Sequence, residues 1–480
     1  MTSHDFSPLL PSDPTAPRRI SPTDVAQYIR LDQCRRYLRL RLHERANGQA
    51  FMRDARVAAQ AIPPLLTRTG NDFEHEVEAS ASAYVGAAVN CRAAAQAGED
   101  AFIGPDHNAL LVARARALPP GQLLLLFQPR LRVALGPWEL RGDVDILRLE
   151  RTATGELHAL IVDIKSSTAA KVEHRIQVAF YHEMLAALFV QAGMSTANLS
   201  TGILYRGPAG GTDSPDPLEQ ARRSAQHAAA ARLFGLQVGF FEQVTDPEAY
   251  REEVRTLVTG ASSTAAEVAT APFEQLSFHL TQKCDGCLYN EFCMRWAAEH
   301  DDLSLIPYLS DTEKNVLCAS GVTTTRDLAM LKEFADASSP DLLTPPAQRP
   351  TVQALSASRT VGPRLDELIH RARRYRRWRG DDLRALTYIP SKGYGSLPAA
   401  DADLHPNLVR VYLDAQHDYL NDRVYLLGAL VTACVAGLER PERRRSMVQL
   451  CPHPPRDPTD ERDLLLGWVA ATVRAIVELA

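Results

Sequence analysis

Residues 157–167 read LHALIVDIKSS, an apolar run that closes on the pattern D-x-K, and this stretch decides the fold. A short run rich in Leu, Ile and Val predicts a buried β-strand over Leu157–Asp163. Because side chains alternate along a strand, Asp163 and Lys165 are expected on the same side of it. Charged residues at strand ends are ordinarily just solvated, so the flanking sequence must decide whether the pair has a function.

The flanking sequence predicts an α/β unit around this strand. Ala-, Leu-, Glu- and Arg-rich segments from residue 20 to about 118 are typical of helices. A helix is expected over 172–191, and helical sequence returns over 218–267. Short strand-like runs separated by Gly and Pro predict an antiparallel meander over 123–127, 131–135, 138–140 and 144–149. One further strand is expected after the helix 172–191, over 201–205.

Two further polar patterns frame the D-x-K strand. The stretch LRGDVDI (140–146) places Asp145 in a G-x-x-D pattern, and Gln177-x-x-x-Tyr181 falls on the expected helix. Two carboxylates that converge with a lysine suit Mg²⁺ or Mn²⁺, which prefer oxygen ligands and lower the pKa of bound water. Lys165 could orient or deprotonate that water and neutralise charge that develops on a phosphate. The combination therefore predicts a single catalytic site.

The cysteines give a second, independent signal. Cys284, Cys287 and Cys293 form a C-x2-C-x5-C run, whose short loop can bring several thiolates to one point. Cys34 is the best candidate for a fourth thiolate. On spacing alone, three interpretations stay open: buried thiols that happen to cluster, a zinc site, and an iron–sulfur cluster. The remaining cysteines are scattered and are interpreted as buried small hydrophobes, Cys91, Cys318, Cys434 and Cys451.

The order of these patterns over about residues 18–300 resembles the RecB-like PD-(D/E)xK nucleases, including the nuclease domains of AddAB helicase–nucleases and the CRISPR-associated RecB-like exonucleases. The resemblance implies an α/β fold with a PD-(D/E)xK restriction-endonuclease-like core and helical additions. It implies a Mg²⁺- or Mn²⁺-dependent deoxyribonuclease, an exonuclease in DNA repair, recombination or defence. In these relatives four cysteines hold a 4Fe–4S cluster as an iron–sulfur staple, which implies the same role for Cys34, Cys284, Cys287 and Cys293.

The resemblance also assigns roles at the D-x-K site. It implies that Asp145 and Asp163 bind the metal ion, that the Ile164 carbonyl is a further ligand, and that Lys165 is the catalytic lysine. Asp143 is expected to be exposed or to lie behind the site, because G-x-x-D selects Asp145. The helix residues Gln177 and Tyr181 are expected beside the site, where they position the lysine, the metal or DNA.

The family also carries a helical pattern, Gly followed a few residues later by a metal-binding His. This chain reads GNDFEHE over 70–76, one residue longer than G-x-x-x-H. We therefore expect His75 to be the ligand, with Glu74 or Glu76 as substitutes. If His75 has no such role, it is an ordinary polar helix residue.

Three segments follow the expected nuclease domain. Residues 301–335 resemble a helix-hairpin-helix, with Gly321 in the turn, and residues 336–405 are expected to be a linker with a basic helix. The last segment, 406–480, resembles the start of an RNase H-like domain. We expect it to be incomplete or degenerate and catalytically silent, because Gln416 stands where D-x-E needs a carboxylate after Asp414 and the chain stops before the later acids. Residues 1–17, Pro-rich and polar, are expected to be disordered.

Composition limits the classes of function. A length of 480 residues predicts two to four domains, and the net charge of -5 gives no global basic field for DNA. DNA contact must therefore be local, with the basic stretch 371–379 and the Gly321 turn as candidates, although a solvated helix face explains the basic stretch about as well.

The sequence shows no apolar run of about 18 residues and no secretion signal, so we expect a cytoplasmic protein without a membrane partner. DNA and a helicase or another DNA-processing protein are the partners expected. The alternatives are a catalytically silent DNA-binding or complex-assembly module with a nuclease fold, and a zinc-stapled DNA-binding protein.

Overall fold

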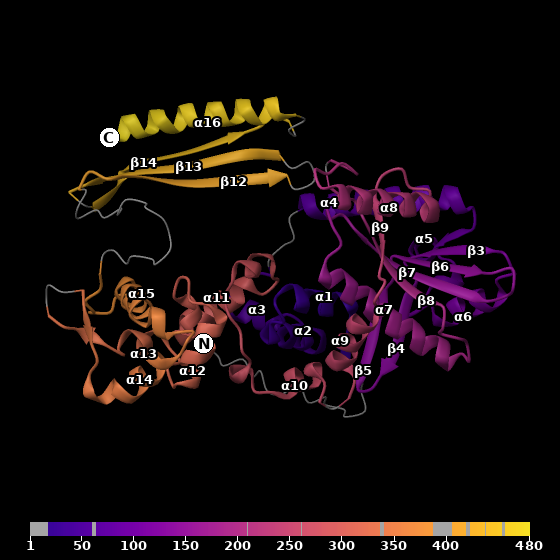
Figure 1. Cartoon of the computed structure of the whole chain (residues 1–480), viewed down its shortest axis with the longest axis horizontal. Helices are drawn as coiled ribbons and strands as arrows, with labels where there is room; N and C mark the ends of the chain where they lie inside the picture. The colour runs from indigo at the N-terminus through magenta and orange to yellow at the C-terminus, as the bar shows by residue number, and fades with distance from the viewer. Residues whose placement is uncertain are drawn as a thin grey trace. The chain divides into compact units, whose positions relative to one another are not determined.

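The structure is a computed structural model of the 480-residue chain, and it divides into two compact units, Met1–Arg295 and Trp296–Ala480 (Figure 1). The expected tail, 1–17, lies outside the described residues, as does part of the expected linker, 387–405. The structure describes residues 18–59, 64–208, 210–260, 262–336, 340–386, 406–418, 423–436, 438–453 and 457–480.

Two sheets organise the first unit. Their strands are β1 Arg18–Ile20, β2 Ala88–Asn90, β3 Leu123–Phe127, β4 Arg130–Leu135, β5 Trp138–Asp143, β6 Ile146–Arg151, β7 Leu157–Lys165, β8 Leu199–Tyr205 and β9 Phe240–Gln243. The larger sheet has the order β2-β3-β6-β7-β8-β9, and the smaller has the order β1-β5-β4. In the larger sheet β7 pairs antiparallel with β6 and parallel with β8, so the D-x-K strand lies in the interior. The expected strands are present, but they do not form one meander, because β4 pairs with β5 in the smaller sheet and β3 pairs with β6 in the larger. The strands β1, β2 and β9 are additional.

Helices surround these sheets. They are α1 Pro22–Arg30, α2 Arg35–Asn47, α3 Ala50–Asp54, α4 Pro64–Val85, α5 Cys91–Gln96, α6 Asn108–Ala117, α7 Val172–Gln191, α8 Pro217–Phe234, α9 Glu248–Val258, α10 Thr264–Thr270 and α11 Asn290–His300. The observed boundary between the units and the expected end of the nuclease domain at residue 300 both fall within α11.

The larger sheet is covered on both faces, which explains why β7 is apolar almost throughout. Val162 and Ile164 face α4 and α8, where they pack in one cluster with Phe73 and Phe234. On the opposite face, Val178 of α7 packs against β8. Because β7 alternates, the residue between Val162 and Ile164 must point to the α7 face, and that residue is Asp163. The fold therefore buries the first residue of D-x-K beneath α7.

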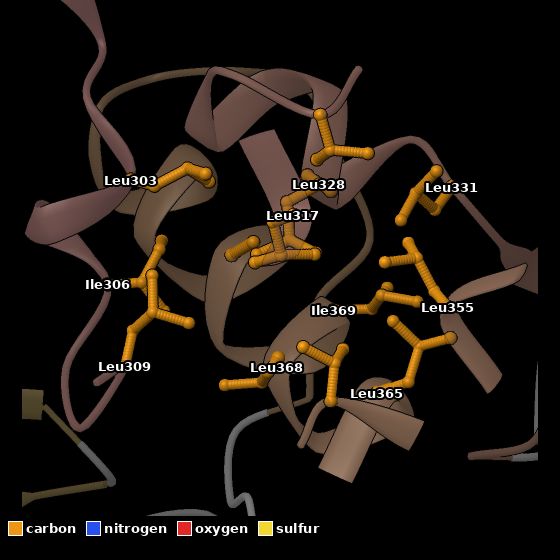
Figure 2. Packing of buried hydrophobic residues seen from close by; sticks show 14 of the residues in the cluster. Leu303, Ile306, Leu309, Leu317, Leu328, Leu331, Leu355, Leu365, Leu368 and Ile369 are labelled. Carbon is orange, nitrogen blue, oxygen red and sulfur yellow. The ribbon is translucent and has the colours of Figure 1, made fainter. Parts of the chain in front are cut away.

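The second unit begins with a helical part, residues 296–386. Its elements are α12 Asp311–Ala319, α13 Thr325–Ala329, β10 Glu333–Phe334, β11 Leu342–Leu343, α14 Arg349–Ala357 and α15 Leu365–Trp378. Figure 2 shows how leucine and isoleucine side chains from these helices meet in one core, which includes Leu317, Leu355 and Leu368. Within residues 336–405, expected to be a linker with a basic helix, the structure instead forms α14, which packs in this core. Val352 and Leu355 give α14 an apolar face, and burying this face fixes the segment in the core.

The second unit ends with a small sheet, formed by β12 Val409–Asp418, β13 Arg423–Val435 and β14 Leu438–Leu450, and with the helix α16 Pro458–Leu479. The three strands are antiparallel in the order β12-β13-β14. Helix α16 packs on one face, where Ala475 and Leu479 meet Val431 and Ala433. No helix in the described part of the chain is long and apolar enough to cross a membrane.

Candidate active site

The C-terminal end of β7 brings an acid and a base together. Lys165 Nζ lies 2.8 Å from Asp163 Oδ2, and the Asp163 side chain is only 1% exposed whereas that of Lys165 is 26% exposed. The Asp163 carboxylate is thus buried, while the Lys165 side chain is partly exposed. The side chains of Asp163 and Lys165 point to the same side because side chains alternate along a strand, as the sequence predicts.

The second carboxylate comes from the corner between β5 and β6. Asp145 lies in the bend just before β6, and its Oδ2 accepts a hydrogen bond of 2.7 Å from the Ile164 backbone N–H. Since Ile146 pairs with Val162, Asp145 lies beside Asp163 at the neighbouring position of the ladder. Asp143, by contrast, forms an ion pair with Arg130 at 2.8 Å.

Two side chains of the helix α7 donate hydrogen bonds to the site. Gln177 Nε2 donates a hydrogen bond of 2.9 Å to Asp163 Oδ1, and Tyr181 Oη donates one of 2.6 Å to the Asp143 carbonyl. A Cβ atom at Gly142 would lie 2.7 Å from the Tyr181 ring, closer than side chains approach, so only glycine fits there. The Gly of G-x-x-D therefore admits the tyrosine that holds the Asp145 corner.

The helix α4 contributes a third carboxylate. Glu74 is half-buried and lies close enough to Asp145 and Lys165 for both charges to shift its pKa; burial and Asp145 raise this pKa, and Lys165 opposes the rise. His75 is exposed and is near Glu78; burial raises the pKa of Glu78, and His75 opposes the rise. The structure thus brings Glu74, the expected substitute, towards the site, and it does not place His75 there.

The carboxyl groups of the site outnumber its cationic groups. Burial raises the pKa of Asp163, and Asp145 adds to the rise while Lys165 opposes it. Burial acts to lower the pKa of Lys165, but Asp163 and Asp145 raise it overall, so the lysine is a cation. Asp163 Oδ2 is buried and accepts no hydrogen bond of regular geometry from the described residues. Three carboxyl groups and one ammonium group can therefore accept a divalent cation, which would supply the missing charge.

Among the described residues, no three His, Cys, Asp or Glu side chains are grouped as a ready cage for a single metal ion. The acidic site is therefore a set of oxygen donors without a closed ligand sphere. Mg²⁺ suits such a set, because it usually keeps several waters and binds through one or two carboxylates and the substrate.

The four cysteines of the second signal lie near one another in the first unit. Burial raises the pKa of Cys34 and of Cys287, and the charge of Cys284 adds to both shifts. Burial also raises the pKa of Cys293, while the nearby Arg36 guanidinium opposes the rise. Segments that are far apart in sequence therefore place these thiols close enough for their charges to interact, although no three of them form a group that could hold a metal ion among the described residues. All four are free thiols in the structure.

The basic helix differs from the expectation, because several of its arginines bind within the unit. Arg373 is buried and donates to the carbonyls of Ala329 and Lys332, whereas Arg376 pairs with Asp301 and Asp381. Arg371 pairs with Glu367. Neutralising these residues would damage the helical core, so they are unsuited to bind phosphate. The exposed basic residues of this stretch are Arg374, Arg377 and Arg379.

The two remaining expected sites lie in the second unit. Gly321 adopts φ +82° in the turn between α12 and α13, a conformation that favours glycine. Asp414 and Gln416 are both exposed on β12, and Gln416 Nε2 lies 3.4 Å from Asp414 Oδ2. No described His, Cys, Asp or Glu side chains complete a metal site there.

Comparisons with known proteins address the first unit. A sequence model of the PD-(D/E)XK nuclease superfamily matches residues 31–294, more than half of the chain. The matched range includes the acidic site and all four clustered cysteines. No curated protein matches the sequence. Among solved structures, the crystal structure of SSO0001 is similar at 11% identity over 47% of this chain and 97% of that chain, with a TM-score of 0.17, too low to inform the fold.

Proposed function

The chain belongs to the PD-(D/E)XK nuclease superfamily, and from this premise we propose that it is a RecB-like, metal-dependent deoxyribonuclease that acts as an exonuclease and carries a structural 4Fe–4S cluster. The observation that carries the activity is the buried Asp163, which contacts Lys165 and Gln177 and lies beside Asp145. A decayed nuclease fold would have no reason to keep a buried carboxylate with an ammonium group and an amide aimed at it, since burying such charge is costly.

The site residues divide the work. Asp145, Asp163, Glu74 and the Ile164 carbonyl would hold Mg²⁺ or Mn²⁺. The cation supplies Lewis-acid chemistry, because it polarises the phosphate and lowers the pKa of the attacking water. Lys165 donates hydrogen bonds from its ammonium group and stabilises negative charge that develops on the phosphate.

Two residues of α7 position this machinery. Gln177 fixes the orientation of the Asp163 carboxylate by its hydrogen bond to Oδ1, which leaves Oδ2 directed at Lys165. Tyr181 fixes the corner that carries Asp145 through the Asp143 carbonyl. Neither residue needs to touch DNA in this scheme.

The four clustered thiols support the iron–sulfur part of the proposal. Cys34 caps the start of α2, while Cys284 lies in the short segment before α11 and Cys293 lies within α11. A cluster ligated by all four would join the beginning of the nuclease domain to its end, and its binding energy would be part of the folding energy. The nearby Arg36 would offset the negative charge of such a cluster.

For the second unit, we propose that the Gly321 turn and the exposed arginines of α15 contact DNA phosphates, and that the sheet β12–β14 with α16 is a silent RNase H-like remnant. A helicase or another DNA-processing protein is the proposed partner. Neutral substitution of Arg374, Arg377 and Arg379 together would flatten the salt dependence of DNA affinity if these contacts exist.

The activity is tested with the full-length protein, purified without oxygen and analysed for iron and zinc. End-labelled single- and double-stranded DNA and closed circular DNA are incubated with Mg²⁺, with Mn²⁺ and with EDTA. The proposal predicts cation-dependent loss of the linear DNA, intact circles, about four irons per chain and a brown colour with absorbance near roughly 400 nm. Stoichiometric zinc would refute the iron–sulfur part, and intact linear DNA with every cation would refute the activity.

A further inference from the structure

One arginine of the first unit borders the acidic site without contributing to the expected motifs. Arg206 follows the end of β8, and its backbone N–H donates a hydrogen bond of 3.1 Å to the Lys165 carbonyl. The next residue, Gly207, donates to the Ser167 carbonyl at 3.2 Å. Since β8 pairs with β7 on the side opposite to β6, Arg206 flanks Lys165 on the side away from Asp145.

The side chain of Arg206 is held by α4. Its guanidinium carbon lies 5.2 Å from the centre of the Phe73 ring, and Phe73 is fully buried and directly precedes Glu74. A Cβ atom at Gly70 would lie 4.0 Å from Ser166 Oγ, so the same helix passes close to the end of β7. The guanidinium is therefore held by stacking on the Phe73 ring, one residue before the site carboxylate Glu74.

The charge of Arg206 is not used within the described part of the chain. Its Nε is buried without a hydrogen-bond partner, and no described carboxylate forms an ion pair with it. Arg130, by contrast, pairs with Asp143, and Arg175 pairs with Glu242. A half-buried planar guanidinium with unused donors can donate two parallel hydrogen bonds to the oxygens of a phosphate.

We propose that Arg206 binds a backbone phosphate of the nucleic-acid strand that lies next to the scissile phosphate, and so sets the register of the strand in the site. This inference rests on the proposed nuclease function. Such a contact positions the strand and carries no base preference. Arg206 thus adds a phosphate clamp on the β8 side, whereas the carboxylates lie on the β6 and β7 side.

The test uses a series of DNA strands in which one linkage at a time around the cut site is a neutral methylphosphonate. At the linkage that Arg206 contacts, wild-type protein should cleave about 10- to 100-fold more slowly, because a charged hydrogen bond is lost. Arg206→Ala should cleave natural DNA more slowly by a similar factor and should lose this one penalty. Arg232→Ala, which removes an exposed arginine of α8, should keep every penalty.

Penalties in Arg206→Ala that equal those of wild type at every linkage would overturn the inference. If Arg206→Ala does not fold, as judged by its circular dichroism, Arg206→Lys replaces it. The lysine keeps the charge but not the planar fork, so the penalty should shrink, and an unchanged penalty would overturn the inference. Wild-type protein that cuts no DNA refutes the proposed function itself, an outcome visible before any variant is compared.

Discussion

Two strands of this protein carry an aspartate that is followed two residues later by a polar side chain, in different surroundings. On β7, Asp163-x-Lys165 has its acid buried, a glutamine from α7 bonded to it, and Asp145 beside it. On β12, Asp414-x-Gln416 lies exposed on an edge strand, and the two side chains contact each other. In both cases the alternation of the strand places the pair on one side.

Two polar residues at this spacing therefore do not by themselves make a catalytic site. Water screens the charge of an exposed carboxylate and competes for its lone pairs. Burial removes this water, so fixed protein partners then determine the pKa and the metal affinity of the carboxylate. The β7 pair has that environment, supplied by α4, α7 and the β5–β6 corner. The β12 pair remains in water.

The largest effect should come from the lysine of the buried pair. Lys165→Ala removes the cation that stabilises charge on the phosphate and should lower the cleavage rate about 100- to 1000-fold. DNA affinity and circular dichroism should stay close to wild type. Asp414→Ala, in the exposed pair, should leave the rate unchanged. The comparison fails if Asp414→Ala abolishes cleavage and Lys165→Ala does not.

A cysteine pair extends the comparison to the stability of the protein. Cys34→Ala should remove the iron and lower the melting temperature by roughly 10 °C, since metal binding energy is folding energy. The control is Cys434→Ala, which changes a buried cysteine of β13 and should keep the full iron content. Iron content and calorimetry measure both. Equal iron in the two variants would remove Cys34 from the cluster.

The third carboxylate can be separated from its histidine neighbour. Glu74→Gln should weaken Mn²⁺ binding roughly 10- to 100-fold, because it removes a charge close to Asp145 and Lys165. His75→Gln changes the exposed neighbour on the same helix and should bind Mn²⁺ as wild type does. Titration calorimetry at one fixed pH gives both affinities. The opposite pattern would restore His75 as the ligand.

The smallest effect should follow from the two glutamines. Gln177→Leu leaves the buried Asp163 without its amide donor and should cost about 1–3 kcal/mol of stability, with a cleavage rate about 10-fold lower. Gln416→Leu removes an exposed contact and should change neither quantity. Urea unfolding and initial rates test this pair. Equal stability of both variants would mean that burial of Asp163 does not depend on Gln177.

Much of the first unit could be predicted from local patterns. Strand and helix periodicity predicts β7 and α7, and the observed α7 spans the expected residues, 172–191. Such patterns predict elements because each reflects one face of burial. They do not predict which helix meets which carboxylate. The approach of Glu74 and the bond from Gln177 to Asp163 depend on how α4 and α7 cross the sheet.

The sequence did not predict the role of the arginines, because an arginine that binds DNA and one that pairs within its own unit have similar neighbours in sequence. The arginines at 371, 373 and 376 form a basic stretch, but the fold turns them towards carbonyls and carboxylates of their own unit. The direction of a long side chain depends on its tertiary neighbours. For the same reason Arg206, a single arginine after a strand, carries no signal in the sequence, although the pairing of β8 with β7 places it beside Lys165.

A matched pair of variants can show whether Asp145 and Asp163 form the catalytic site. Asp145→Asn and Asp143→Asn make the same change two residues apart, at a site carboxylate and at one that pairs with Arg130. The measurement is the initial rate of cleavage of end-labelled DNA at saturating Mg²⁺. The account predicts a rate at least about 100-fold lower for Asp145→Asn, and a rate close to wild type for Asp143→Asn. Equal rates for the two variants would contradict it.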